Sequence, residues 1–291
     1  MTVPAHSLNP SQRLWYARMV VAAILADGQI DVAEVEFIKQ VISIIEDPKS
    51  KTAILKLIET KQAPPIEPPP QSTPDQLLAA IYLELVLICL ADSDFNSDER
   101  FFLKQVATSL EFTDSYIKKV ELWLEEGLDW KQKQMSLLPA NSGLHMGEVP
   151  LKEFNAAQKL WYAQLMVATI LLDKNLDDFE VQFLKMAISF VEAKADKITL
   201  MRHVKNRIAP SIEPPPKFTQ NQLIQIMFSV IQVISADEAI SYAEQTYLRE
   251  LFETCSLPAP VHQALFSWCQ QGVQWKSSKN ALIHWVRRKN A

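Results

Sequence analysis

Acidic side chains recur at fixed spacing along this chain, and clustered carboxylates are the ligands that hard divalent cations prefer. An eight-residue pattern occurs four times: an Asp, an apolar residue three positions later, an Asp, Asn or Ser four positions later, and a final Glu. The copies occupy residues 27–34, 92–99, 173–180 and 237–244. The first two copies suggest a loose divalent-cation site with the candidate ligands Asp27, Asp31, Glu34, Asp92, Asp94 and Glu99.

The same spacing also describes the start of a helix, and we prefer this capping interpretation. Good N-cap residues stand at the fifth position of the copies, at Asp31, Asn96, Asp177 and Ser241. A Glu follows each of them by three positions, where its carboxylate reaches back to the backbone N–H of the cap. A standard EF-hand is excluded, because its first and third calcium ligands would be Ala23 and Leu25, which have no side-chain oxygen.

The elements that hold these loops are predicted to be helices. Apolar residues recur at helical spacing on both sides of the first loop, at Leu14, Ala17, Val21 and Ile24 and at Val35, Ile38, Ile42 and Ile45. The 291-residue chain contains only five Gly, which argues against a β protein with many tight hairpins. We therefore predict an all-α fold.

The second half of the sequence also repeats the pattern of the first half. The Leu-Trp-Tyr-Ala of residues 14–17 returns at 160–163, displaced by 146 positions. Within each half the acidic pattern recurs once, which makes each half a pair of helical-hairpin units. We predict one helical domain at 8–138, a linker at 139–153 and a second helical domain at 154–289.

Two further repeated features have a structural and a functional interpretation. The Pro-rich strings at 64–74 and 210–216 are interpreted as straps inside each domain rather than as ligands for another protein. Tryptophans at matching positions are interpreted as core rather than as a recognition surface, at Trp15 and Trp161, Trp123 and Trp268, and Trp130 and Trp275.

Composition narrows the functional classes. A formal net charge of -5 gives no sign of a nucleic-acid surface. The three cysteines are too few and too irregularly spaced for a disulfide framework or a zinc site, which favours the cytoplasm. We expect no membrane insertion, because the longest apolar stretch, 77–91, contains Glu84 and is short for a bilayer span. No secretory signal is recognised before residue 8.

No residue set specifies a reaction. The five His residues do not stand at a recognisable spacing from a Ser or Cys nucleophile, and no Gly-rich phosphate loop is present in the sequence. We therefore predict no enzyme, with neither catalytic nor cofactor-binding residues. Glu84 is either a satisfied buried carboxylate or one edge of a groove; the corresponding region of the second half carries Ser229 and Gln232.

The Ala-Asp-Gly-Gln-Ile of residues 26–30, followed by Glu34 and set between two amphipathic helices, resembles the signature of the TerB-like family. This small all-helical domain occurs in tellurite-resistance operons and at the cytosolic end of some membrane-anchored J-domain co-chaperones. Only the first copy has the complete string, because Lys174 replaces Gly28 in the third copy and Glu238 stands there in the fourth. The resemblance implies two tandem helical domains and stress response, metal association or scaffolding, without a catalytic activity.

We predict a non-enzymatic cytoplasmic scaffold that docks protein partners or associates with itself, as a homodimer or in a larger complex. One alternative is a metal-associated tellurite- or stress-response protein that binds divalent cations through the acidic loops of the first domain. Another is an adaptor subunit of a larger bacterial assembly, such as a secretion or envelope complex.

Overall fold

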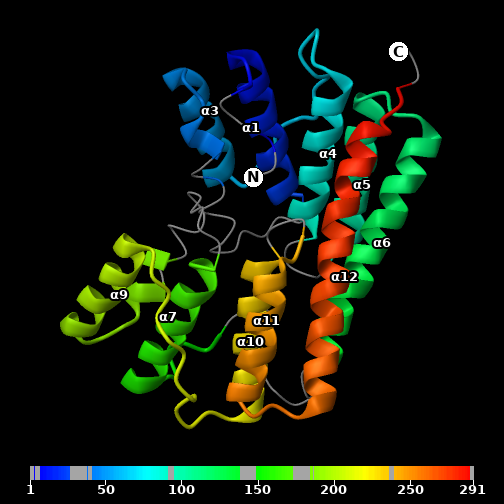
Figure 1. Cartoon of the computed structure of the whole chain (residues 1–291). Helices are drawn as coiled ribbons and strands as arrows, with labels where there is room; N and C mark the ends of the chain where they lie inside the picture. The colour runs from blue at the N-terminus through cyan, green and yellow to red at the C-terminus, as the bar shows by residue number, and fades with distance from the viewer. Residues whose placement is uncertain are drawn as a thin grey trace. The chain divides into compact units, whose positions relative to one another are not determined.

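A computed structural model of the chain describes residues 3, 7–26, 38, 41–90, 95–137, 149–172, 184–185, 187–235 and 239–288. These residues fold into α-helices, so the predicted all-α class is confirmed (Figure 1). Within the described part of the chain, the one strand-like pairing is an isolated antiparallel bridge between Phe112 and Arg288.

The helices recur in two matching sets. The first set is α1 (Pro10–Ile24), α3 (Pro48–Glu59), α4 (Asp75–Cys89), α5 (Ser97–Ser109) and α6 (Asp114–Leu137). The second set is α7 (Ala156–Ile170), α9 (Lys194–Asn206), α10 (Gln220–Ile234), α11 (Tyr242–Thr254) and α12 (Ala259–His284). Helices α1, α4, α7 and α10 have 15 residues each, and α5 and α11 have 13 each. The repeated sequence therefore folds into repeated helices.

Capping boxes fix where these helices begin. The Asn96 side chain accepts the backbone N–H of Glu99 at 3.2 Å, and the Glu99 carboxylate accepts the backbone N–H of Asn96 at 2.9 Å. Ser241 forms the same box ahead of α11. These two predicted caps are confirmed, whereas those at Asp31 and Asp177 lie outside the described residues.

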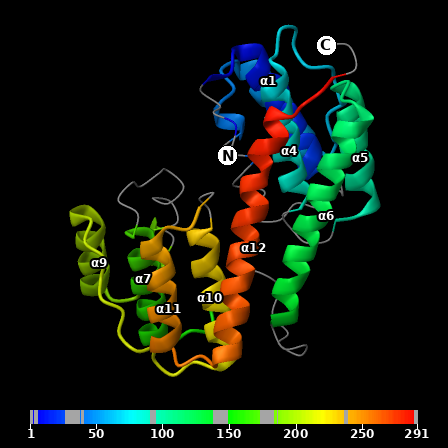
Figure 2. The ribbon, with the colours of Figure 1, turned by 45° about the vertical axis from the view of Figure 1, so that its right-hand side comes forward.

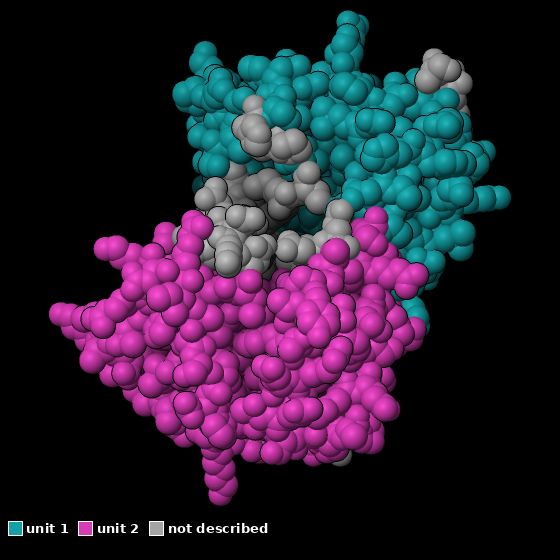
Figure 3. All heavy atoms as spheres, viewed as in Figure 1, with its two compact units in different colours: residues 1–129, 278–291 teal, residues 130–277 magenta. Residues whose placement is uncertain are grey.

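The chain divides into two compact units. Unit 1 comprises residues 1–129 and 278–291, and unit 2 comprises residues 130–277 (Figure 3). The end of α6 is thus assigned to unit 2 and the end of α12 to unit 1. The domain limits expected from the sequence, 8–138 and 154–289 around the linker 139–153, stay a prediction.

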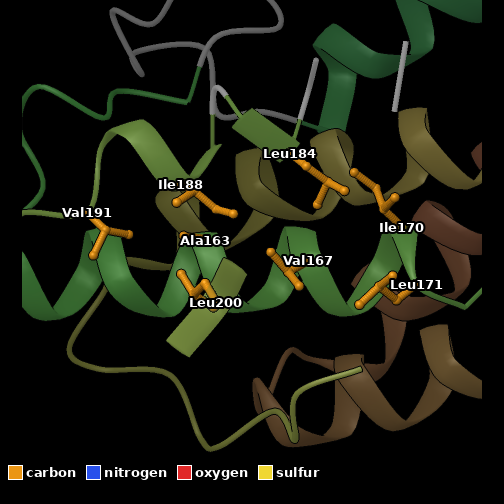
Figure 4. Close-up of a cluster of buried hydrophobic side chains, with 8 residues drawn as sticks. All are labelled: Ala163, Val167, Ile170, Leu171, Leu184, Ile188, Val191 and Leu200. Atoms are coloured by element: carbon orange, nitrogen blue, oxygen red, sulfur yellow. The ribbon is translucent and has the colours of Figure 1, made fainter. Parts of the chain in front are cut away.

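Both units pack their helices in the same order. In unit 1, α1 lies against α3 and α4 (Figure 1), and in unit 2, α7 lies against α9 and α10 (Figure 2). Apolar side chains fill the interface of α7 with its neighbours, and the cluster consists of Ala163, Val167, Ile170, Leu171, Leu184, Ile188, Val191 and Leu200 (Figure 4). Burial of such aliphatic side chains provides the main driving force for this packing.

The Pro-rich strings act as straps within the units. The indole N–H of Trp15 donates to the carbonyl oxygen of Glu67 at 2.9 Å, and that of Trp161 donates to the carbonyl oxygen of Glu213 at 2.8 Å. Each repeated tryptophan thereby holds the repeated string of its own unit. All six repeated tryptophans are buried, as predicted.

No helix in the described parts of the chain combines the length and the apolar character needed to cross a membrane.

Candidate functional site

The predicted cation ligands are only partly described. Asp27, Asp31, Glu34, Asp92 and Asp94 lie outside the described residues. Glu99 is buried, and its carboxylate accepts the backbone N–H of Asn96, as the capping interpretation predicts. Among the described residues, no group of three or more His, Cys, Asp or Glu side chains is placed to hold a metal ion. The cation hypothesis stays a prediction.

The carboxylate of Glu84 lies at the centre of unit 1, where α4 packs against α1. One oxygen accepts the hydroxyl of Tyr16 at 2.9 Å, and the other accepts the backbone N–H of Val3 at 3.1 Å. Burial raises the pKa of this carboxyl above its ordinary value, while the hydrogen bonds from Tyr16 and Val3 and, more weakly, the ammonium of Lys279 oppose the rise. Because both oxygens are paired and the side chain is buried, Glu84 is a satisfied carboxylate and not the edge of a groove.

The corresponding centre of unit 2 is neutral. Ser229 stands 145 positions after Glu84, and Gln134 stands 145 positions before Lys279. Ser229 forms a hydrogen bond with the hydroxyl of Tyr162, whose pKa burial raises to about 12. Both Ser229 and Gln134 are buried. The sequence repeat therefore places a carboxyl group at the centre of one unit and only neutral polar side chains at the corresponding place of the other.

Two thiols of unit 2 are poor nucleophiles. Burial raises the pKa of Cys255 and of Cys269 to about 12 in each case, which keeps both protonated at neutral pH. A reactive thiol needs the opposite shift, toward the thiolate.

A groove between α11 and α12 is the best candidate for a binding site, and we call it the α11–α12 groove. Its volume is ≈ 390 Å³, within the range of pockets that hold small ligands or parts of peptides. Both helices contribute to its lining, which consists of Arg249, Phe252, Glu253, His262, Gln263, Phe266, Ser267 and Gln270. The spacing of these residues places them on one face of each helix.

Aromatic rings and one unpaired nitrogen mark this groove. Phe252 is buried, and its ring lies 5.4 Å from the ring of His262, centroid to centroid. The Nε2 atom of His262 is buried and has no hydrogen-bond partner in the structure. An unsatisfied buried polar atom typically costs ~1–3 kcal/mol, and a turn of the ring that brings Nε2 to a hydrogen-bonding group in the groove would remove this penalty.

Unit 1 carries different residues at the corresponding positions of α5 and α6. Ile117 stands 145 positions before His262, and Glu121 stands 145 positions before Phe266. Ala107 likewise precedes Phe252 by 145 positions. The aromatic lining is therefore specific to unit 2. The sequence interpretation missed this groove, although these departures from the repeat were a signal that could have located it.

Comparisons of the chain with protein-family models, with curated proteins and with solved structures find no match. Membership of the TerB-like family thus stays a prediction from the sequence pattern. What the protein binds has to be inferred from the geometry of its own surfaces.

Proposed function

We propose that the protein is a non-enzymatic interaction scaffold that docks a short helical segment of a partner protein in the α11–α12 groove. The observation that carries this proposal is the aromatic lining of the groove, in which Phe266 is partly exposed and the buried ring of Phe252 lies 5.4 Å from the ring of His262. Apolar anchors seated between two helices are a common way of binding an amphipathic helix.

The length of the groove fits such an occupant. From His262 to Gln270 the lining follows α12 for about 12 Å, at ~1.5 Å per residue. This distance matches roughly two turns of a bound helix, which would present apolar side chains at positions i and i+4. Those side chains would cover Phe266, and a hydroxyl or amide of the partner would pair with His262 after a turn of its ring.

The rim of the groove indicates the polarity of the partner. Arg249 and Glu253 stand one turn apart on α11 and supply one charge of each sign. The exposed side chains with which α12 lines the groove are uncharged, and they are Gln263, Ser267 and Gln270. A segment with polar, nearly neutral flanks complements this rim better than a strongly charged one.

The proposed location is the cytoplasm, where thiols stay reduced. Cys89, Cys255 and Cys269 are not joined in disulfides, which suits a reducing compartment. The scaffolding role that the TerB-like resemblance implies agrees with this proposal.

Site-specific photo-crosslinking in the native cells tests the proposal. A photoreactive residue replaces Ser267, an exposed rim position, in the full chain; the matched control carries it at Glu250, which is exposed on α11 but does not line the groove. We expect the crosslink at position 267 to map to a helical partner segment with apolar residues at i and i+4. Phe266→Glu should lower its yield more than about tenfold, the effect of losing a central anchor.

Crosslinks that appear equally from positions 267 and 250, or that survive Phe266→Glu, would contradict docking in this groove. Circular dichroism of the variant, with helix content equal to that of the unmodified chain, excludes unfolding as the cause of a lost crosslink.

A further inference from the structure

Helix α9 is attached to unit 2 through one side only. It lies beside α7 at the edge of the unit (Figure 2). Leu200 is the one residue of this fully described helix that is buried, and Val204 adds a partly buried contact with the same apolar cluster. The opposite side of α9 is therefore left exposed.

Large apolar side chains gather in this exposed segment. Ile198 and Met201, one turn apart on α9, are 52% and 51% exposed, and Ile208, just after the helix, is 59% exposed. The backbone N–H of Ile208 donates to the carbonyl oxygen of His203 at 3.1 Å, which holds this residue at the helix end. Three of the seven exposed large apolar residues in the described part of the chain lie here, so they form a group. Grouped exposed apolar residues mark interaction surfaces.

Basic side chains alternate with these apolar residues. Lys194, Arg202 and Lys205 are exposed, and their spacing places them on the same side of α9 as its two exposed apolar residues. No ion pair with another described residue engages any of the three. Residues 194–208 contain five Lys or Arg and one Asp, in a chain whose formal net charge is -5. The segment is thus a local basic surface on an acidic protein.

We propose that α9 binds the surface of an anionic lipid bilayer. Aliphatic side chains set among exposed Lys and Arg are typical of helices that lie in the plane of the membrane interface. There the apolar side chains enter between the headgroups, while the long basic side chains extend to the phosphates. The cytoplasmic leaflet carries anionic lipids that attract basic segments, so the proposal agrees with a cytoplasmic protein that lies on the membrane without crossing it.

A lipid surface fits this segment better than a protein or a nucleic acid. Protein interfaces are enriched in aromatic residues and depleted in Lys, whereas residues 194–208 contain several Lys and no Phe, Tyr or Trp. Single-stranded nucleic acids also need aromatic rings on which their bases stack. A duplex would contact the basic side chains through its phosphates, but it would leave Ile198 and Met201 without a role.

The corresponding helix of unit 1 shares the charge of α9 but not its apolar group. Residues 48–62, which precede 194–208 by 146 positions, contain four Lys and one Glu. In this fully described segment the one exposed large apolar side chain is Leu55, at the position of Met201. Polar residues stand at the positions of the other two. Helix α3 therefore provides control positions for charge and for a single apolar side chain.

Co-sedimentation of the full chain with lipid vesicles tests the proposal. One set of vesicles contains phosphatidylcholine and phosphatidylglycerol in equal parts, and the other contains phosphatidylcholine alone. We expect binding to the anionic vesicles that weakens with added salt and is at least about tenfold tighter than binding to the neutral ones.

Variants of α9 should weaken this binding. Ile198→Gln combined with Met201→Gln should weaken it at least about tenfold, because two aliphatic side chains no longer leave water. Arg202→Gln combined with Lys205→Gln should have an effect of similar size, because two cations no longer meet the anionic surface.

Matched control variants change α3 in the same way. Leu55→Gln is the control for Met201→Gln, and Lys49→Gln combined with Lys56→Gln removes the same charge as the basic α9 variant. Both controls should stay within about twofold of the unmodified chain. Phe266→Glu should also keep the vesicle binding, because the α11–α12 groove is a different site; either proposal can therefore fail without the other.

Three results would overturn the proposal: no binding to anionic vesicles, equal binding to neutral vesicles, or equal losses from the α3 and α9 variants. Binding of a short DNA duplex or an acidic peptide in place of vesicles, abolished by Arg202→Gln with Lys205→Gln, would also overturn it and assign the surface to that polymer. Circular dichroism with unchanged helix content excludes unfolding as the cause of a loss.

Discussion

In unit 1 the buried hydroxyl of Tyr16 donates to the carboxylate of Glu84, whereas in unit 2 the corresponding hydroxyl of Tyr162 is paired with Ser229. The same helices pack around both centres, so this frame requires neither the carboxylate nor the ammonium of Lys279. The same arrangement of helices therefore accommodates two different polar pairs, and in each pair the tyrosine hydroxyl has a hydrogen-bond partner.

The two units also differ away from these centres. Unit 1 has the carboxylates of Asp75 and Glu111 around the guanidinium of Arg288, while unit 2 lines the α11–α12 groove with Phe252 and Phe266. The two units share their core helices and differ in the residues around the Arg288 contact and around the groove. Differences between corresponding positions are therefore the best guide to function in this molecule.

The largest expected effects concern the tryptophans that both halves share. Trp123→Ala should lower the free energy of unfolding by ~3–5 kcal/mol, because it leaves a large cavity in unit 1. Trp268→Ala should fall at the upper end of that range. Its indole N–H donates to the carbonyl oxygen of Trp130 at 2.9 Å, and the two rings stack with centroids 4.6 Å apart. Urea denaturation measures both values.

A loss below ~1 kcal/mol for either tryptophan would mean that the ring is not a core residue. Tryptophan fluorescence that is fully quenched by solvent would say the same.

The next largest effect concerns the polar side chain at the centre of each unit. Removing it should lower the free energy of unfolding more in unit 1 than in unit 2. Glu84→Ala should cost ~2–4 kcal/mol, because it leaves the buried hydroxyl of Tyr16 and the backbone N–H of Val3 without their acceptor. Ser229→Ala should cost only ~1 kcal/mol, the usual value of one neutral hydrogen bond. Chemical denaturation of the two variants side by side gives the difference. Equal losses would mean that the carboxyl group of Glu84 contributes no more to stability than the hydroxyl of Ser229.

A smaller effect is expected on the pH dependence of the free energy of unfolding. It should depend on Glu84 in unit 1 and not on Ser229 in unit 2. The pKa of Glu84 is raised in the folded state, so between the unfolded-state value of ~4.3 and the raised folded value the native state binds more protons. This group therefore makes the free energy of unfolding fall as pH rises through that window. Glu84→Gln should remove the fall, whereas Ser229→Ala should leave it in place.

Urea titrations at several pH values give both curves. If the curve of Glu84→Gln runs parallel to that of the unmodified chain, the carboxyl does not carry the raised pKa.

The smallest expected effect is that of added cations on both units. If the acidic loops are capping boxes, millimolar calcium, magnesium or zinc should leave the melting temperature unchanged, and Asp31→Ala should cost ~1 kcal/mol. A cation site would instead give a saturable rise in the melting temperature. A stoichiometric calorimetric signal that Asp27→Asn abolishes would support the metal-binding alternative.

The sequence predicted those features that depend on nearby residues. Asn96 and Glu99 are three positions apart, so their capping box is written in a short stretch of sequence. The burial of repeated tryptophans such as Trp15 followed from their recurrence at matching positions. Local spacing and repetition were sufficient for the helices and for much of the core.

The features that were not predicted depend on contacts between distant positions. Glu84 is satisfied by Tyr16, which is 68 positions away, and Arg288 meets the carbonyl of Leu110 across 178 positions. The α11–α12 groove likewise requires Phe252 and His262 to come together from two helices. The periodicity of a single sequence does not specify such long-range pairings. These pairings account for most of the differences between the two units.

Docking in the α11–α12 groove is tested most directly by giving unit 2 the residues of unit 1. The full chain with His262→Ile and Phe266→Glu carries there the residue types of Ile117 and Glu121. The measurement is the yield of the partner crosslink from position 267, in this variant and in the unmodified chain. We predict a loss of more than about tenfold, with helix content unchanged. An undiminished yield would show that the difference between the two units does not create the docking site.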